Sequence, residues 1–138
     1  MSVTRSLVAV LGGMGLVSIL VDVLEFTLVN AAAGGTITDM EGYFAVRNRP
    51  VMQAAQLGYN VVAAVLGGYL TARVAGTREM LHGGVAGVGK TMALAWGFTF
   101  GEYAAFTPAW MRIVLVLATG PAMLAGAWIR ARAARSDT

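Results

Sequence analysis

Four long apolar stretches dominate the pattern of residues along this chain. They run over residues 6–29, 51–72, 80–100 and 108–129, and polar residues gather between them. Each stretch reaches about 20 residues, the length at which an α-helix crosses the hydrocarbon core of a bilayer. The pattern therefore predicts an all-α fold, an integral membrane four-helix bundle of antiparallel up-down topology, with residues 1–138 forming a single domain.

The longest polar connection covers residues 30–50, which we expect to form an outer loop. It contains a short amphipathic piece, 39–46, in which Asp39 is suited to cap a helical turn. Pro50 is suited to the first turn of the second long helix, and Gly76 to its C-terminal end. The tight turn that follows Gly76 makes the second and third long helices antiparallel neighbours.

Composition supports a location in the membrane. Of the 138 residues, 57% are hydrophobic and 12% are charged, and the mean hydropathy is +0.69. A soluble domain of this size is less apolar. The net charge is +3, but the basic residues sit at the ends of the apolar stretches and form no basic face, so we expect no nucleic acid partner. The absence of cysteine excludes disulfides and thiolate chemistry.

The distribution of arginines predicts the orientation in the membrane. With the N-terminus in the cytoplasm, six arginines lie inside and three outside, which the positive-inside rule favours. The inside set is Arg5, Arg73, Arg78, Arg130, Arg132 and Arg135, and the outside set is Arg47, Arg49 and Arg112. We therefore expect a multi-pass protein of the bacterial inner (plasma) membrane with both termini cytoplasmic.

The first apolar stretch also imitates a signal peptide, because Arg5 precedes it and an alanine tract follows it. Asp22 and Glu25 interrupt the path from the apolar run to the point where cleavage would occur. We therefore expect this stretch to be retained as the first membrane span.

Residues 84–91, GVAGVGKT, match the phosphate-binding P-loop pattern. A working P-loop lies between a buried strand and the start of a helix, so that its backbone N–H groups are free to bind phosphate. Here no strand precedes the motif, and apolar residues continue to Phe100. We interpret the motif as the middle of a helix and expect no nucleotide partner.

Six residues of the third stretch recur at intervals of three or four and so share one helical face: Gly83, Gly87, Lys90, Leu94, Gly97 and Gly101. The four glycines of this series predict close packing against neighbouring helices. Lys90 shares the face and is therefore expected to point into the bundle.

Six polar residues in three apolar stretches form a candidate intramembrane cluster: Asp22, Glu25, Gln53, Gln56, Asn60 and Lys90. A charge near the bilayer centre costs about 2.5–3.5 kcal/mol, so each one requires a partner. With a rise of about 1.5 Å per residue, Asn60 lies near the level of Lys90 and Gln56 near that of Asp22. A polar column with a Lys90–Asp22 pair is predicted. It can fix helix packing, conduct an ion, proton or small solute, or bind lipid or a partner helix.

The sequence offers no support for an enzyme. His82 is the only histidine and has no cysteine or carboxylate cluster beside it, so we interpret it as a residue of the membrane interface. Ser6 and Ser18 have no histidine or aspartate at the spacing of a catalytic triad. No metal ion and no cofactor is expected.

Several segments resemble a broad group of small, uncharacterised four-helix bacterial membrane proteins. They are the late glutamate of the first stretch, LGGYLTARVAG, LHGGVAGV and TPAW. The resemblance implies a four-helix fold in the inner membrane, and it supplies no site residues. Small multidrug exporters also carry a glutamate in the first of four helices, but here Glu25 lies near the outer boundary and Lys90 would compete for it.

These observations predict an accessory or structural membrane protein without enzymatic activity. We expect it to contact lipid and to pack with itself, as a homo-oligomer, or with a larger membrane complex. The alternative is a small ion- or proton-coupled transporter or channel that uses Asp22, Glu25, Asn60 and Lys90.

Overall fold

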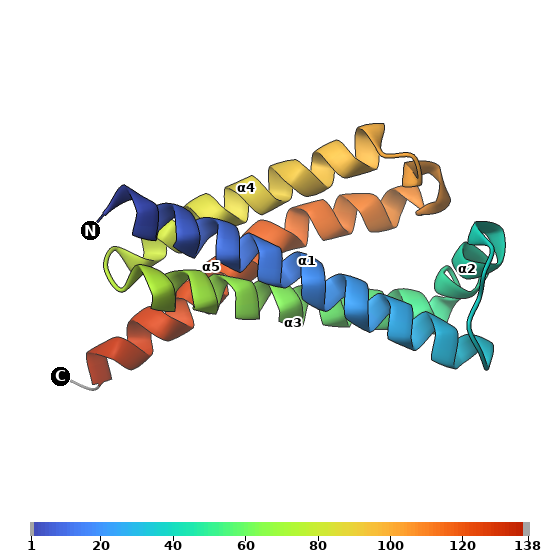
Figure 1. The fold of residues 1–138 in the computed structure, drawn as a ribbon, viewed down its shortest axis with the longest axis horizontal. Coiled ribbons are helices and arrows are strands. Elements are labelled where there is room, and N and C mark those ends of the chain that lie inside the picture. Colours follow the sequence, from blue (N-terminus) through green and yellow to red (C-terminus); the bar gives the residue numbers. More distant parts are fainter. Residues whose placement is uncertain (1, 137–138) are drawn as a thin grey trace.

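The computed structural model describes residues 2–136, and it contains helices and no strands within that range. The elements are α1 (Val3–Ala33), α2 (Met40–Arg47), α3 (Pro50–Ala75), α4 (Glu79–Phe100), the short 3-10 helix η1 (Ala104–Phe106) and α5 (Ala109–Ser136). The predicted all-α class is confirmed. Each apolar stretch gives one long helix, and successive long helices run antiparallel (Figure 1). The P-loop-like motif lies inside α4, as the sequence predicts.

The helix ends follow from local chemistry. The Asp39 carboxylate accepts a hydrogen bond of 2.6 Å from the backbone N–H of Gly42 and so caps α2. Pro50 lies in the first turn of α3, where a missing N–H costs nothing. Gly34 and Gly76 end α1 and α3 with φ angles of 79° and 68°, the left-handed conformation that glycine adopts without strain.

Helix α3 is the centre of the bundle. It packs along α1 on one side and along α5 on the other, and α4 packs chiefly against α5. The contact between α1 and α4 is much smaller, and these two helices diverge toward the end of the molecule that carries α2 (Figure 1). We call that end the outer end and the opposite one, with the α3–α4 turn, the inner end. The bundle is therefore tight around α3 and open along the α1–α4 seam.

Glycines bring α3 into backbone contact with both neighbours. A Cβ atom on Gly68 would overlap the backbone carbonyl of Met123 in α5, and one on Gly126 would overlap the carbonyl of Val65 in α3. On the other side of α3, Gly67 faces the backbone of Gly13 in α1. Such contacts let helices approach closely where lipid supplies no hydrophobic drive for association.

The four glycines expected to pack α4 divide into two groups. Gly83 faces Ala127, and Gly87 lies against Gly120, so both belong to the α4–α5 contact. Gly97 is exposed and has open space where a side chain would be, and Gly101 follows the helix as its C-cap. The small-residue contact therefore covers only the inner half of α4.

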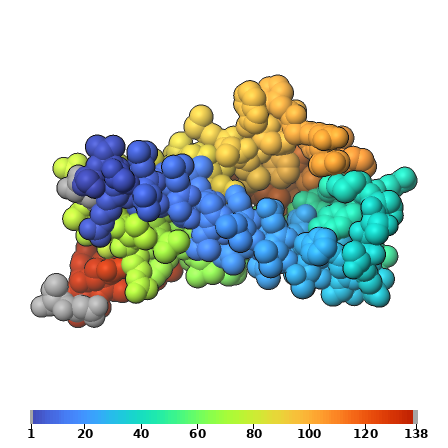
Figure 2. All heavy atoms as spheres, in the orientation of Figure 1, coloured from blue at the N-terminus to red at the C-terminus, as the bar shows by residue number. Residues whose placement is uncertain are grey.

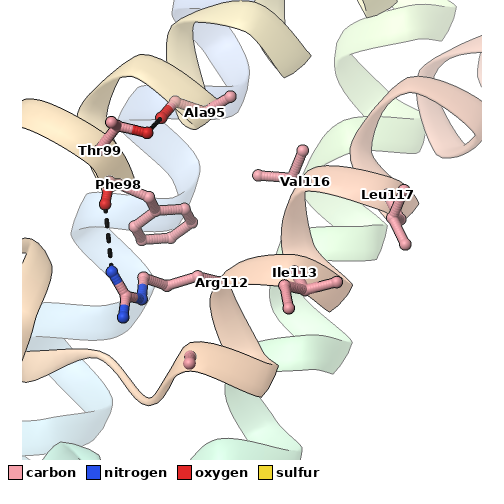
Figure 3. Close-up of a pocket in the computed structure, with 8 residues that line it drawn as sticks. Ala95, Phe98, Thr99, Arg112, Ile113, Val116 and Leu117 are labelled. Atoms are coloured by element: carbon pink, nitrogen blue, oxygen red, sulfur yellow. Dashed lines mark hydrogen bonds between the residues drawn. The ribbon is translucent and has the colours of Figure 1, made fainter.

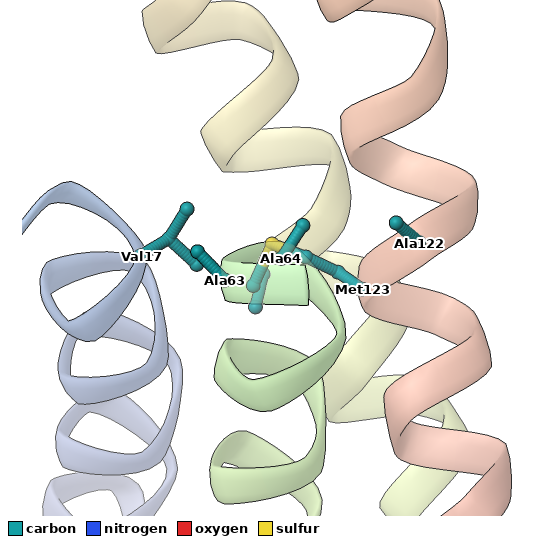
Figure 4. Packing of buried hydrophobic residues seen from close by; sticks show 6 residues of the cluster. Val17, Ala63, Ala64, Ala122 and Met123 are labelled. Atoms are coloured by element: carbon teal, nitrogen blue, oxygen red, sulfur yellow. The ribbon is translucent and has the colours of Figure 1, made fainter. Parts of the chain in front are cut away.

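The buried core is built mainly from small side chains. Figure 4 shows Val17, Ala63, Ala64, Ala122 and Met123 gathered between the helices, and Ala86 completes this cluster. Met123 is fully buried and fills the space that the alanines leave. Many large apolar side chains instead point outward. The space-filling view in Figure 2 shows α1 lying along the surface for its whole length.

Within residues 2–136, two helices are long and apolar enough to cross a membrane, α1 and α5. Only 17% of the most apolar part of α1 is buried in the protein, and 33% of that of α5. Both helices therefore present apolar side chains to the surroundings. In α1 these include Leu11, Ile19, Val23 and Phe26. The polar residues of α3 and the glycines and lysine of α4 lower the hydropathy of those two helices.

Gly126→Ala is expected to destabilise the bundle, because the added methyl group meets the Val65 carbonyl and forces α3 and α5 apart. Overpacking of this kind costs about 1–3 kcal/mol. Gly97→Ala is the matched control, since its methyl group enters open space and alanine favours a helix by up to about 1 kcal/mol. Thermal unfolding of both variants in one detergent checks the difference, and equal melting temperatures would contradict the packing described here.

Candidate functional site

The Glu25 carboxylate joins three helices at the outer end of the bundle. Its Oε1 atom lies 2.8 Å from Nε of Arg47 in α2. Its Oε2 atom accepts hydrogen bonds from the hydroxyl of Tyr59 at 2.8 Å and from Nε2 of Gln56 at 3.3 Å, both in α3. The side chains of Glu25 and Arg47 are only 17% and 8% exposed, so this is a buried ion pair. We refer to Glu25, Arg47, Gln56 and Tyr59 as the outer latch.

Arg47 extends the outer latch to the start of α5. Its Nη1 atom donates a hydrogen bond of 3.0 Å to the hydroxyl of Thr107, and its guanidinium carbon lies 5.3 Å from the ring centre of Phe44. Next to it, Nδ2 of Asn48 donates to the carbonyl oxygen of Phe106 at 2.7 Å. The connection between α1 and α3 is therefore bonded to the connection between α4 and α5 as well as to α1.

Aromatic rings cover the outer latch. Phe44 and Phe106 are stacked with ring centres 4.8 Å apart, and Tyr103 lies 6.1 Å from Phe44. Burial, and secondarily the negative charge of Glu25, raises the pKa of Tyr43 to about 12. The Tyr43 hydroxyl therefore stays protonated at neutral pH and adds no second negative charge near Glu25.

Lys90 does not form the predicted ion pair with Asp22. Its Nζ atom instead donates a hydrogen bond of 2.5 Å to the hydroxyl of Ser18, across the α1–α4 seam. Asp22 lies one turn further along α1 and attracts Lys90 electrostatically, but the two groups are not within salt-bridge distance. Asp22 is exposed. Ser18 lies one turn closer than Asp22 to the depth of Lys90 along the bundle, whereas the prediction favoured Asp22 because of its charge.

The other predicted cluster residues do not form one column. Asn60 donates to the backbone carbonyl of Gln56 within its own helix at 2.8 Å. Gln53 is half-buried and makes no side-chain hydrogen bond within residues 2–136. The structure thus brings together Glu25 and Gln56, and it leaves Lys90 and Asp22 along the seam. The outer latch also includes Arg47 and Tyr59, which the sequence did not single out.

Two cavities flank the outer half of α4. One, of about 380 Å³, lies in the seam and is lined by Glu25, Arg47, Lys90, Leu94, Phe98 and Tyr103, among others. The other, of about 410 Å³, lies between α4 and α5, where Phe98, Ile113 and Val116 face one another (Figure 3). At its edge, Nη1 of Arg112 donates to the carbonyl oxygen of Phe98 at 3.3 Å (Figure 3). This half of α4 is therefore loosely packed on both sides.

No family model, curated protein or solved structure matches the chain. Within residues 2–136, no three histidine, aspartate or glutamate side chains lie close enough together to hold a metal ion.

Glu25→Gln is expected to destabilise the protein strongly, because it leaves the Arg47 cation buried without a counter-charge. Removing one partner of a buried ion pair costs about 3–5 kcal/mol. The double variant Glu25→Gln with Arg47→Met removes both charges and should lose less stability than Glu25→Gln alone. Unfolding in denaturant measures both. The single variant Arg47→Met completes the comparison. If the double variant lost as much unfolding free energy as the two single variants together, the two side chains would not depend on each other.

Proposed function

We propose that the chain is a multi-pass inner-membrane protein whose α1, α3, α4 and α5 cross the bilayer, and that it serves as an accessory subunit packed against another membrane protein. The apolar periphery supports the membrane location. Besides α1 and α5, helix α4 presents Met92, Trp96 and Phe100 to the surroundings, each about two-thirds exposed at 67%, 68% and 67%. A soluble protein rarely exposes apolar surface on this scale.

Asp22 is the observation that carries the accessory role. It is exposed on the apolar helix α1, and no side chain within residues 2–136 forms a hydrogen bond or ion pair with it. A carboxylate facing lipid is costly, and such residues almost always face a partner or a water-filled space. A helix of another subunit that carries a cation or a hydrogen-bond donor meets this requirement.

The α1–α4 seam is where that helix would dock. Asp22 and Ser18 are four residues apart and so share the face of α1 that meets Lys90. The contact between α1 and α4 is small, and a cavity of about 380 Å³ lies beside it. A symmetric pair of α1 helices that crosses at Asp22 would bring this carboxylate against its own copy, and like charges repel. A non-symmetric contact with a different surface is therefore favoured, in a homo-oligomer or a larger complex.

The alternative function is a small ion- or proton-coupled transporter or channel. Glu25 and Lys90 line one cavity, which is the arrangement that such a pathway requires. Toward the inner end, however, the space between the helices is filled by the buried apolar core, which includes Val17, Ala63 and Ala64. This core offers no polar group to continue a pathway. Three of the charged groups that line the cavity, Glu25, Arg47 and Lys90, already have partners within the chain. These features favour the accessory role.

Gentle detergent extraction followed by native mass spectrometry tests the accessory role. The wild-type protein should retain a second polypeptide or a second copy, and Asp22→Leu should reduce its recovery at least about tenfold by removing the charge that it neutralises. Glu41→Leu is the matched control, because this carboxylate is exposed on α2, away from the seam.

A wild-type protein that retains only lipid would contradict the accessory role. Proton or ion flux in reconstituted vesicles that is lost in both Glu25→Gln and Lys90→Met would instead support the transporter.

Single cysteines test the topology, since the chain contains none. In sealed cells, Thr36→Cys in the outer connection should react with a membrane-impermeant maleimide, and Ser136→Cys at the end of α5 should react only after lysis. Both positions are exposed, so burial does not confound the comparison. The reverse pattern would place the termini outside.

A further inference from the structure

The inner end of the bundle contains a contact that the proposed function does not use. Nε2 of His82, near the start of α4, lies 3.2 Å from the hydroxyl oxygen of Ser6 in α1, although the two residues are 76 positions apart. His82 is 8% exposed, and Ser6 is half-buried. The sequence suggested no partner for either residue, because their proximity depends on how α1 packs against α4.

The second contact of the imidazole indicates which ring nitrogen carries the proton in the neutral form. Nδ1 of His82 lies 3.1 Å from the backbone carbonyl oxygen of Arg78. A carbonyl oxygen only accepts hydrogen bonds, so this contact is favourable when Nδ1 carries the proton. In the neutral ring Nε2 then has a lone pair directed at Ser6 and accepts its hydroxyl proton. This is the geometry of a nucleophile and its general base, oriented by a third group.

The carbonyl of Arg78 is held in place by an unusual backbone conformation. Arg78 has a φ of 47°, the one positive φ at a residue other than glycine within residues 2–136. Its carbonyl oxygen also accepts the backbone N–H groups of Leu81, at 3.0 Å, and His82, at 3.2 Å. Left-handed conformations at such residues are often found at functional sites.

A cavity gives a substrate access to both reactive atoms. It measures about 510 Å³ and is lined by Ser6, Thr77, Arg78, Leu81 and His82. Among the lining residues Arg78 is positively charged and Leu81 is apolar. The cavity therefore suits an amphiphile with an anionic group near a reactive carbonyl.

We propose that Ser6 and His82 form a nucleophile–base pair that hydrolyses a carboxylic ester of an anionic amphiphile. The Ser6 oxygen bonds to the ester carbon while its proton passes to Nε2 of His82. The bond from that carbon to the leaving oxygen breaks, and the leaving alcohol takes the proton. Water then attacks the carbonyl carbon of the acyl group on Ser6 and gives a proton to Nε2 of His82. The bond from that carbon to the Ser6 oxygen breaks, the carboxylic acid leaves, and the proton returns to the Ser6 oxygen.

The absence of native cysteine permits a test that needs no knowledge of the substrate. In Ser6→Cys the introduced thiol lies beside the imidazole base, so it should react with iodoacetamide at pH 7 about tenfold faster than in Ser6→Cys combined with His82→Gln. Thr4→Cys, exposed on the same end of α1, reports the rate of a thiol without a base. Rates in the unfolded chains normalise the comparison, and circular dichroism checks the fold.

Covalent labelling of the unaltered serine completes the test. A fluorophosphonate probe should modify Ser6 in the wild-type protein, as located by peptide mass spectrometry, and the adduct should be absent in His82→Gln. Equal alkylation rates of Ser6→Cys and Thr4→Cys, or no adduct on Ser6, would overturn the proposal and leave the Ser6–His82 contact as a link between helices. Neither outcome bears on Asp22, which lies in the outer half of α1.

Discussion

The backbone contact of α3 with both α1 and α5 is the constraint on which the rest of the structure depends. Gly67 and Gly68 are neighbours in the sequence and point in different directions, so one faces Gly13 of α1 and the other faces the Met123 carbonyl of α5. A side chain at either position would separate α3 from its neighbour. With α3 fixed between the two helices, α4 packs chiefly along α5, and its contacts with α3 and α1 are smaller.

Polar contacts then organise the two ends in different ways. At the outer end, the Glu25–Arg47 ion pair fastens the loop helix α2 to α1 and α3. Tyr59 and Gln56 donate hydrogen bonds to one carboxylate oxygen, Oε2, whereas the other, Oε1, faces Nε of Arg47 at 2.8 Å without forming a hydrogen bond. Hydrogen bonds from neutral donors help to offset the cost of burying such a pair, and here they reach only Oε2. At the inner end, Ser6 and His82 form a hydrogen bond between α1 and α4 beside an open cavity, and Nε of Arg5 in α1 donates to the carbonyl oxygen of Val74 in α3.

Much of the fold could be predicted from the sequence because helices and their ends are set by local chemistry. The apolar stretches, the Asp39 cap and the left-handed Gly76 each depend on residues a few positions apart. The candidate site depends on rotation about the helix axes, which depth along an axis does not fix. Rotation does not separate Asp22 from Ser18, which share one face of α1, and the prediction favoured Asp22 for its charge although Ser18 lies one turn closer to the depth of Lys90. Arg47 was counted only as an outer charge, since its role requires α2 to fold back over Glu25.

The two cavities beside α4 have a mechanical consequence. The inner half of this helix is clamped by Gly83 and Gly87 against α5, whereas residues beyond Lys90 have empty volume on both sides. Helix α4 is thus tightly packed in its inner half and loosely packed in its outer half. A bend in the outer half would widen the seam while the contacts around α3 keep their geometry, and this is the room that the proposed docking of a second helix requires.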